Sequence, residues 1–146
     1  MVFGFPGSTD QYLPSYAVDL IMNQSDPDRV RIREEKLKVL NKHMKNNPGV
    51  RIQYASKDAR VANYWKKMIG ENDGIKRMKG IDVKQAYETS FQEWAENTNY
   101  SGLLPAFKKT YTALGPLNVA TDYLMEAGLA IELVGYANGF SAMHAV

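Results

Sequence analysis

Residues 50–69, VRIQYASKDARVANYWKKMI, decide the fold, because they form the longest stretch that predicts a helix without interruption. At about 100° per residue, the apolar side chains that share one face of this helix are Val50, Tyr54, Val61, Trp65 and Met68. The polar side chains that share the opposite face are Gln53, Ser56, Arg60, Asn63 and Lys67. The pattern therefore predicts one face for burial and one that is open to water or a ligand.

The segment before this stretch predicts two more helices. A short one is expected over Leu13–Asn23, and Ser25 is then a candidate N-cap for a longer one. Its first turn would contain Pro27 between two aspartates, and it would reach about Asn46. Asn47-Pro48-Gly49 should stop it. Because this connector is so short, the long helix and the helix from Val50 should form an antiparallel hairpin.

The second half of the chain predicts further helices with apolar faces. Asn72-Asp73-Gly74 and Lys79-Gly80 should weaken or break the helix, which leaves Ile75–Met78 as a helical turn or a bent continuation. A helix capped by Asp82 would follow. Leu103–Leu114 would form a shorter helix, and Gly115-Pro116 would open the last one. The face that this last helix should bury consists of Leu117, Ala120, Leu124, Ala127, Ile131 and Val134. The whole sequence thus predicts an all-α bundle of five or six helices.

Length and composition are those of an ordinary globular domain. The 146 residues, 45% hydrophobic and 23% charged, can bury a single sizeable core. Cysteine is absent, which excludes disulfides and thiolate metal sites. His43 and His144 are far apart and neither has a second ligand at helical spacing, so we expect no metal and no cofactor. No stretch approaches the roughly 18 apolar residues of a membrane span.

The net charge of +2 conceals an asymmetry between two parts of the chain. Residues 29–79 contain 15 Lys and Arg against 5 Asp and Glu, whereas the remaining residues contain 3 against 11. A basic half of this kind could contact a nucleic acid or an acidic partner. It could equally belong to helical layers of opposite charge that neutralise each other. We favour the second interpretation, because base-stacking aromatics do not alternate with the basic residues, and we expect no nucleic-acid partner.

The residues alone supply no catalytic centre. Gly4-Phe5-Pro6-Gly7-Ser8 has neither the spacing of a nucleophile elbow nor the length of a phosphate loop. Glu34 and Glu35 are adjacent, so they diverge on a helix. The segment MVFGFPGSTD lacks the basic flank and apolar run of a signal peptide. Val2–Phe5 predicts a strand without a partner strand, which suggests that the chain is a piece of something longer.

Three passages carry a resemblance to a known family. They are VFGFPGSTDQYLPSYAVD, RVRIREEKLKVLNKHM and VRIQYASKDARVANYWKKMIGENDGIKRMK. Together they resemble the helical domain of the S46 family of bacterial serine dipeptidyl peptidases, which includes dipeptidyl peptidases 7 and 11. The segment TDYLMEAGLAIEL is similar to the end of that domain. The resemblance covers nearly the whole chain, and its most specific parts are FGFPG followed by QYLPS and the RIQYAS…ANYWK block.

The resemblance implies a part of a larger enzyme. Family members have a chymotrypsin-like double β-barrel with a His, Asp, Ser triad, and an inserted helical domain that caps the cleft. They release dipeptides from the free amino end of peptides. Residues 1–12 would then be the last barrel strand and its turn, 13–140 the helical cap domain, and 141–146 a tail. The family's Asn-His-His-Cys and Gly-Asn-Ser-Gly motifs are absent here, so this chain alone should contain no catalytic residue and be inactive.

The resemblance also implies one substrate-binding residue. The position that matches the family's asparagine in the ANYWK block is Asn63, whose amide oxygen would accept a hydrogen bond from the substrate's free amino group. A plain boundary residue on an amphipathic helix is the alternative, and Tyr64 and Trp65 are expected in the core. The implied partners are an oligopeptide with a free N-terminus and the missing β-barrel, in a periplasmic or cell-surface protein whose signal peptide lies outside this segment.

Two other expectations concern association. Surfaces that normally meet the barrel would expose apolar patches in this chain. We therefore expect it to self-associate, with a homodimer as one form. The alternative function, from a different class, is a stand-alone helical module whose basic half binds nucleic acid or an acidic protein.

Overall fold

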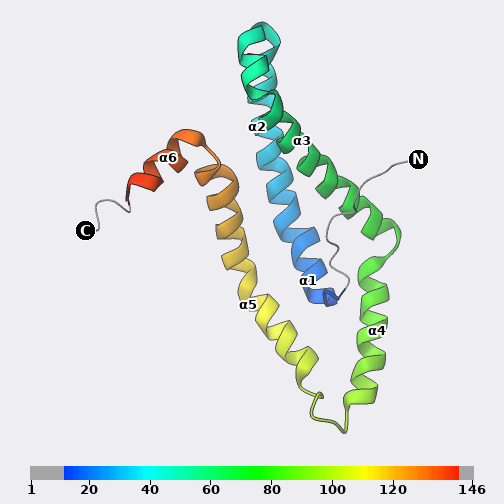
Figure 1. The fold of residues 1–146 in the computed structure, drawn as a ribbon. Coiled ribbons are helices and arrows are strands. Elements are labelled where there is room, and N and C mark those ends of the chain that lie inside the picture. The colour runs from blue at the N-terminus through cyan, green and yellow to red at the C-terminus, as the bar shows by residue number, and fades with distance from the viewer. Residues whose placement is uncertain (1–11, 142–146) are drawn as a thin grey trace.

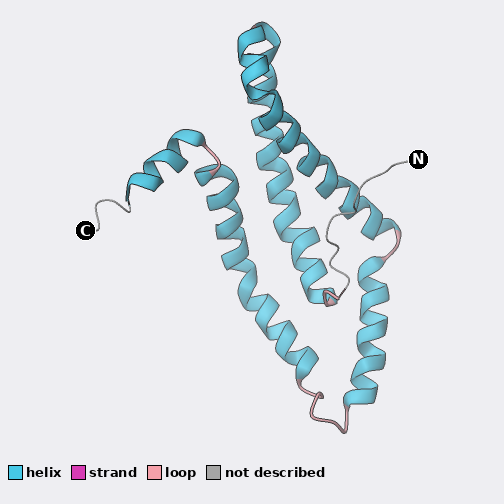
Figure 2. Ribbon diagram, in the orientation of Figure 1, coloured by secondary structure: helices cyan, strands magenta, loops and turns pink. Residues whose placement is uncertain are grey.

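The computed structural model of the chain describes residues 12–141, and Figures 1 and 2 show that these residues form long helices joined by short turns. In chain order the elements are α1 (Ser15–Leu20), η1 (Ile21–Ser25), α2 (Asp26–Asn46), α3 (Pro48–Arg77), α4 (Gly80–Ala95), α5 (Leu103–Tyr123), η2 (Leu124–Leu129) and α6 (Glu132–Ser141). The π-helical segments η1 and η2 continue their neighbours. The all-α prediction is confirmed for residues 12–141, which contain no strand, whereas Val2–Phe5 lies outside the described residues.

The first long rod runs without a break through α1, η1 and α2, so the predicted cap at Ser25 is wrong. Ser25 has helical dihedrals of φ −65° and ψ −55°, and its side chain makes no capping hydrogen bond. Pro27 lacks an N–H group and its ring crowds the preceding turn, which normally ends or kinks a helix. Here the wider turn of η1 directly precedes Pro27 and lets the helix continue.

The predicted hairpin between α2 and α3 is confirmed. Asn47 is extended, with φ −141° and ψ 104°, and its Oδ1 accepts a hydrogen bond from the Val50 backbone N–H at 3.2 Å. The two helices then run antiparallel and in contact (Figure 1). Asn72-Asp73-Gly74 does not break the helix: α3 continues to Arg77, in agreement with the predicted alternative of a continuation. The chain turns instead at Lys79, whose φ of 49° lies in the left-handed region.

The predicted start of a new helix at Gly115-Pro116 is also wrong. Both residues lie inside α5. Gly115 is buried where α5 meets the first rod, and a Cβ there would lie 3.0 Å from Gln24 Oε1 and 3.6 Å from Leu20 Cδ1. This close packing holds the helix together across the proline. The chain breaks further on, at residues 130–131, before α6 begins.

The core is smaller than the single sizeable one that composition predicts. In the described part of the chain the buried apolar residues are Ala17, Val18, Leu20, Met22, Met68 and Ala95. Most of them belong to the first rod, which lies between α3, α4 and α5 (Figure 1). Apolar side chains of α4 and α5 are open: Trp94 is 63% exposed, and so is Leu117, which the sequence assigned to a buried face. Both helices therefore carry apolar surface that residues 12–141 do not cover.

Opposite charges join the two halves of the chain, as the favoured interpretation of the charge asymmetry predicts. Arg29 of α2 pairs with Asp122 of α5. Lys57 Nζ of α3 lies 2.7 Å from Glu132 Oε1 of α6. The basic helices α2 and α3 are thus partly neutralised by acidic residues of the last third of the chain.

Candidate functional site

The exposed face of α3 is the surface on which the sequence places its one candidate. Gln53, Ser56, Arg60, Asn63 and Lys67 are all exposed. On the other face, Met68 is buried and Val61 and Trp65 are half-buried. The two-faced pattern of this helix is therefore confirmed. The Asn63 amide has no hydrogen-bond partner among residues 12–141, so its oxygen is available to a ligand that approaches from outside.

Tyr64 and Trp65, which follow Asn63, were both expected in the core, but Tyr64 lies at the surface and Trp65 is only half-buried. Tyr64 is 50% exposed, and the Arg33 guanidinium lies 5.2 Å from the centre of its ring. A cation at this distance is attracted by the ring face, which accounts for the position of Tyr64 at the surface. Trp65 is half-buried, and its Nε1–H is enclosed without an acceptor in the described part of the chain.

The charges near Asn63 are mostly positive. Arg60, Lys66 and Lys67 lie within one turn of it on α3, and Lys67 Nζ is 2.7 Å from Glu71 Oε1. Cations at this spacing repel a substrate ammonium. The Asn63 oxygen can therefore supply one acceptor, but a carboxylate from outside residues 12–141 would be needed to offset the positive charge of a bound amine.

A groove of about 860 Å³ lies beside this face, where α2 and α3 meet η2 and the turn before α6. Its aliphatic lining consists of Ile32, Val39, Leu40, Val61, Ala127, Ala130 and Ile131. Its charged lining consists of Arg31, Arg33, Lys36, Lys57, Arg60, Glu35 and Glu126. Arg60 borders the groove and lies one turn before Asn63 on α3, so the groove and the exposed face are neighbours.

Glu126 holds this groove together from the η2 side. Its Oε1 accepts hydrogen bonds from Arg33 Nη2 at 2.5 Å and Arg33 Nε at 3.2 Å. Lys36 Nζ lies 3.5 Å from Oε2 of the same carboxylate. Burial lowers the pKa of the Lys36 ammonium, and Glu126 opposes that shift. The lining nevertheless has more cations than carboxylates, and Arg60 has no carboxylate partner among residues 12–141.

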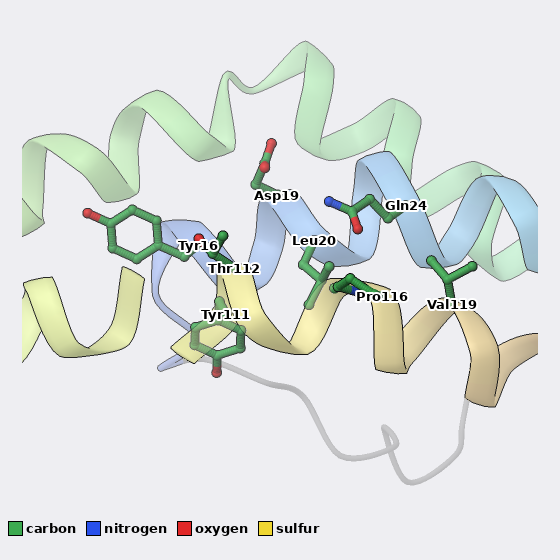
Figure 3. Close-up of a pocket in the computed structure, with 9 residues that line it drawn as sticks. Tyr16, Asp19, Leu20, Gln24, Tyr111, Thr112, Pro116 and Val119 are labelled. Atoms are coloured by element: carbon green, nitrogen blue, oxygen red, sulfur yellow. The ribbon is translucent and has the colours of Figure 1, made fainter. Parts of the chain in front are cut away.

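A second pocket, drawn in Figure 3, lies between the first rod and α5 and has a volume of about 590 Å³. Tyr16, Asp19, Leu20 and Gln24 face Tyr111, Thr112, Pro116 and Val119 across it. Two of its polar side chains are engaged locally, since Asp19 accepts from Asn23 and the Thr112 hydroxyl donates to the Lys108 carbonyl. We therefore interpret it as a gap between packed helices.

Residues 12–141 contain neither a candidate metal cluster nor a membrane-spanning helix. No three His, Asp or Glu residues of this range lie where they could hold a metal ion. His43 is exposed, and His144 lies outside the described residues. None of the helices in this range is long and apolar enough to cross a bilayer.

Comparison with known proteins identifies the family. The model of the family described as Peptidase S46 matches residues 1–145. The chain belongs to the peptidase S46 family. The Asp/Glu-specific dipeptidyl-peptidase of Flavobacterium psychrophilum is 45% identical over an alignment of 130 positions, which covers 86% of this chain and 18% of that protein. Dipeptidyl-peptidase 7 of Porphyromonas gingivalis is 39% identical over an alignment of 149 positions including gaps, which covers 98% of this chain and 21% of that protein.

These matches confirm the resemblance that the RIQYAS…ANYWK block carries. The chain spans about a fifth of the length of these S46 relatives. The role of Asn63 stays a prediction. Sequence reasoning missed the groove, because its key ion pair joins Arg33 to Glu126, which are 93 residues apart. The charge asymmetry indicated that the halves attract, but it could not say which residues would meet.

Proposed function

We propose that this chain is part of a serine-type S46 dipeptidyl peptidase, in which it contributes to a helical cap over a cleft formed elsewhere in the protein. Three observations support the proposal. The family is shown, and the relatives named above are dipeptidyl-peptidases. The described residues are entirely helical apart from turns, which fits a helical cap. Large apolar side chains of α4 and α5 are exposed, as expected for a layer that packs against further protein.

The single observation that carries the substrate-binding part is the exposure of Asn63. Its amide is open to solvent and free of internal partners in residues 12–141. We assign to its oxygen one hydrogen bond from the free amino group of a peptide substrate. A site that requires such an amine rejects blocked N-termini, because burying its acceptors unpaired is costly. The same cap would exclude water from the cleft when substrate is bound.

The test is Asn63→Ala in the full-length peptidase. A hydrogen bond to a charged group is worth about 1.5–3 kcal/mol, so kcat/KM for dipeptide release from a peptide with a free N-terminus should fall by roughly 10- to 150-fold. Gln53→Ala is the matched control, since Gln53 is an exposed amide on the same helix. An Asn63→Ala enzyme with unchanged kcat/KM would remove Asn63 from the site and leave the cap with a structural role.

A further part of the proposal concerns the cellular location of the enzyme. We place it in the periplasm or at the cell surface, which cell fractionation with an antibody to the peptidase would test.

The alternative of a stand-alone module that binds nucleic acid gains no support from the geometry, because Arg29, Arg33, Lys36 and Lys57 already pair with carboxylates of the same chain.

A further inference from the structure

The guanidinium of Arg33, on α2, contacts two other helical segments at once. Its central carbon lies over the Tyr64 ring of α3, 5.2 Å from the ring centre. Its Nη2 and Nε both donate to Oε1 of Glu126 in η2, at 2.5 Å and 3.2 Å. The side chains of Arg33 and Glu126 are only 15% and 14% exposed, so water weakens their contact little. One planar group therefore joins α2, α3 and η2.

The two contacts use different parts of the guanidinium. A planar cation can lie with its face on an aromatic ring while the N–H groups at its edge donate to a carboxylate. A lysine ammonium is a compact point charge and has neither a face nor a fork of donors. Arg33 can therefore hold the Tyr64 ring and Glu126 together, and a lysine at this position could not.

Tyr64 directly follows Asn63, so a contact that holds Tyr64 also constrains the rotation of α3 at Asn63. Apolar packing constrains this rotation less, because Val61 and Trp65 on the packed face are only half-buried and hydrophobic burial is not directional. The end of an exposed side chain lies roughly 5 Å from its helix axis, so a rotation of about 10° moves it by about 1 Å. A misplacement of that size can cost an enzyme about 100-fold in rate.

We propose that Arg33 is a positioning residue for the substrate's amino group. Through the Tyr64 ring it fixes the rotation of α3 at which the Asn63 oxygen meets that group, and it does not itself touch the substrate. Glu126 holds the other side of the guanidinium, so the position of η2 enters the same constraint. The inference rests on the substrate-binding role of Asn63 proposed above.

The test is a double-mutant cycle in the full-length peptidase, with a peptide substrate that has a free N-terminus. Arg33→Lys keeps the charge but loses the planar face and the fork of donors. Its KM should rise by about 5- to 50-fold, while kcat should change by less than about twofold, because Asn63 binds the amine equally in the ground state and the transition state. In the Asn63→Ala background the same substitution should raise KM by less than about twofold. Arg51→Lys, at an exposed position near the start of α3, is the matched control and should leave both constants unchanged.

A second pair of variants tests the contact from the side of Tyr64 and replaces Arg33→Lys if that variant does not fold. Tyr64 is 50% exposed, so its substitution should be tolerated by the fold. Tyr64→Leu removes the ring and should raise KM as Arg33→Lys does. Tyr64→Phe keeps the ring face and should raise KM less. Equal rises in these two variants would show that the ring face does not matter and would overturn the inference.

The cycle separates failure of this inference from failure of the proposed function. An unchanged KM in Arg33→Lys, or an equal rise of KM with and without Asn63, would overturn the positioning role and leave the role of Asn63 intact. An unchanged kcat/KM in Asn63→Ala would overturn both.

Discussion

The hydroxyl of Ser25 donates a hydrogen bond of 2.5 Å to Oδ2 of Asp122, a residue 97 positions further along the chain. Both side chains are buried, and Arg29 Nε donates to the other oxygen of the same carboxylate at 2.7 Å. Asp122 thus fixes the π-helical turn η1 to α5. Hydrogen bonds from a hydroxyl and a guanidinium also satisfy a charge that would be costly to bury alone.

Asp122→Ala should therefore destabilise the protein substantially. It leaves the Ser25 hydroxyl and the Arg29 guanidinium without their shared acceptor, and we expect a loss of about 2–3 kcal/mol in the free energy of unfolding. Urea unfolding followed by circular dichroism measures the change. Asp73→Ala, which removes an exposed carboxylate of α3, is the control and should change stability by less than about 0.5 kcal/mol. Similar losses in both variants would contradict the anchoring role of Asp122.

Glu126→Gln should loosen the wall of the groove. The amide keeps the shape of the side chain but loses the charge that holds Arg33 and Lys36, so we expect a destabilisation of about 1–2 kcal/mol. Glu34→Gln is the control, because Glu34 is exposed and its pair with Lys38 at 3.5 Å should contribute little. Loss of Glu126 also removes the charge that opposes the downward shift of the Lys36 pKa. In an NMR titration of the lysine side chains, the Lys36 pKa should fall further, and an unchanged value would contradict this account.

Asp26→Asn should stabilise the protein at neutral pH. Burial raises the pKa of the Asp26 carboxyl above its ordinary value of 3.8, and Arg29 opposes the shift. The folded state then binds the proton more tightly than the unfolded state, so the free energy of unfolding decreases as pH rises through the raised pKa. The variant lacks this cost. Its melting temperature should exceed that of the parent at pH 7, and the difference should shrink as pH falls toward 3.8. A difference that is constant with pH would contradict the ionisation of Asp26 as its cause.

Lys79→Gly should also stabilise the protein. Lys79 has φ 49° and ψ 44°, a conformation that costs a residue with a Cβ roughly 1–2 kcal/mol. Part of this gain is lost because glycine is freer in the unfolded chain, so we expect a net increase of about 0.5–1 kcal/mol. Lys76→Gly, in the last turn of α3, should have the opposite sign because glycine is a poor helix former. Thermal unfolding of the pair measures both effects, and loss of stability in both would show that the turn does not require the left-handed conformation.

Local patterns in the sequence predicted the all-α class, the α2–α3 hairpin and the two faces of α3 correctly. The alternation of apolar and polar residues around Asn63, and the Asn47-Pro48-Gly49 stop, depend on neighbours within a few positions. Breaks predicted at Ser25 and at Gly115-Pro116 were wrong, because contacts between distant segments decide them. The Ser25 hydroxyl binds Asp122, and Gly115 packs on Leu20. Local propensity contains no information about either contact.

The extent of the core and the site were only partly predictable for a related reason. The apolar spacing of Leu117 and Leu124 shows that these residues require a partner, but not whether residues 1–146 contain it. The exposure of Asn63 was predicted from the helical period of α3. The ion pairs of Glu126 could not be predicted. The charge asymmetry indicates that two parts of the chain attract each other, but it does not determine which residues pair.

Because the rod from Ser15 to Asn46 is unbroken, a tilt at one point along it would move the tip of the α2–α3 hairpin as a rigid body. At 1.5 Å per residue the rod is about 48 Å long, and the buried junction of Ser25, Arg29 and Asp122, which would act as its fulcrum, lies in the half nearer Ser15. A tilt of about 5° at that fulcrum would displace the far tip by roughly 3 Å, given the helical rise. A small rearrangement between η1 and α5 would therefore swing the distant turn at Asn47 through a distance comparable to a hydrogen bond.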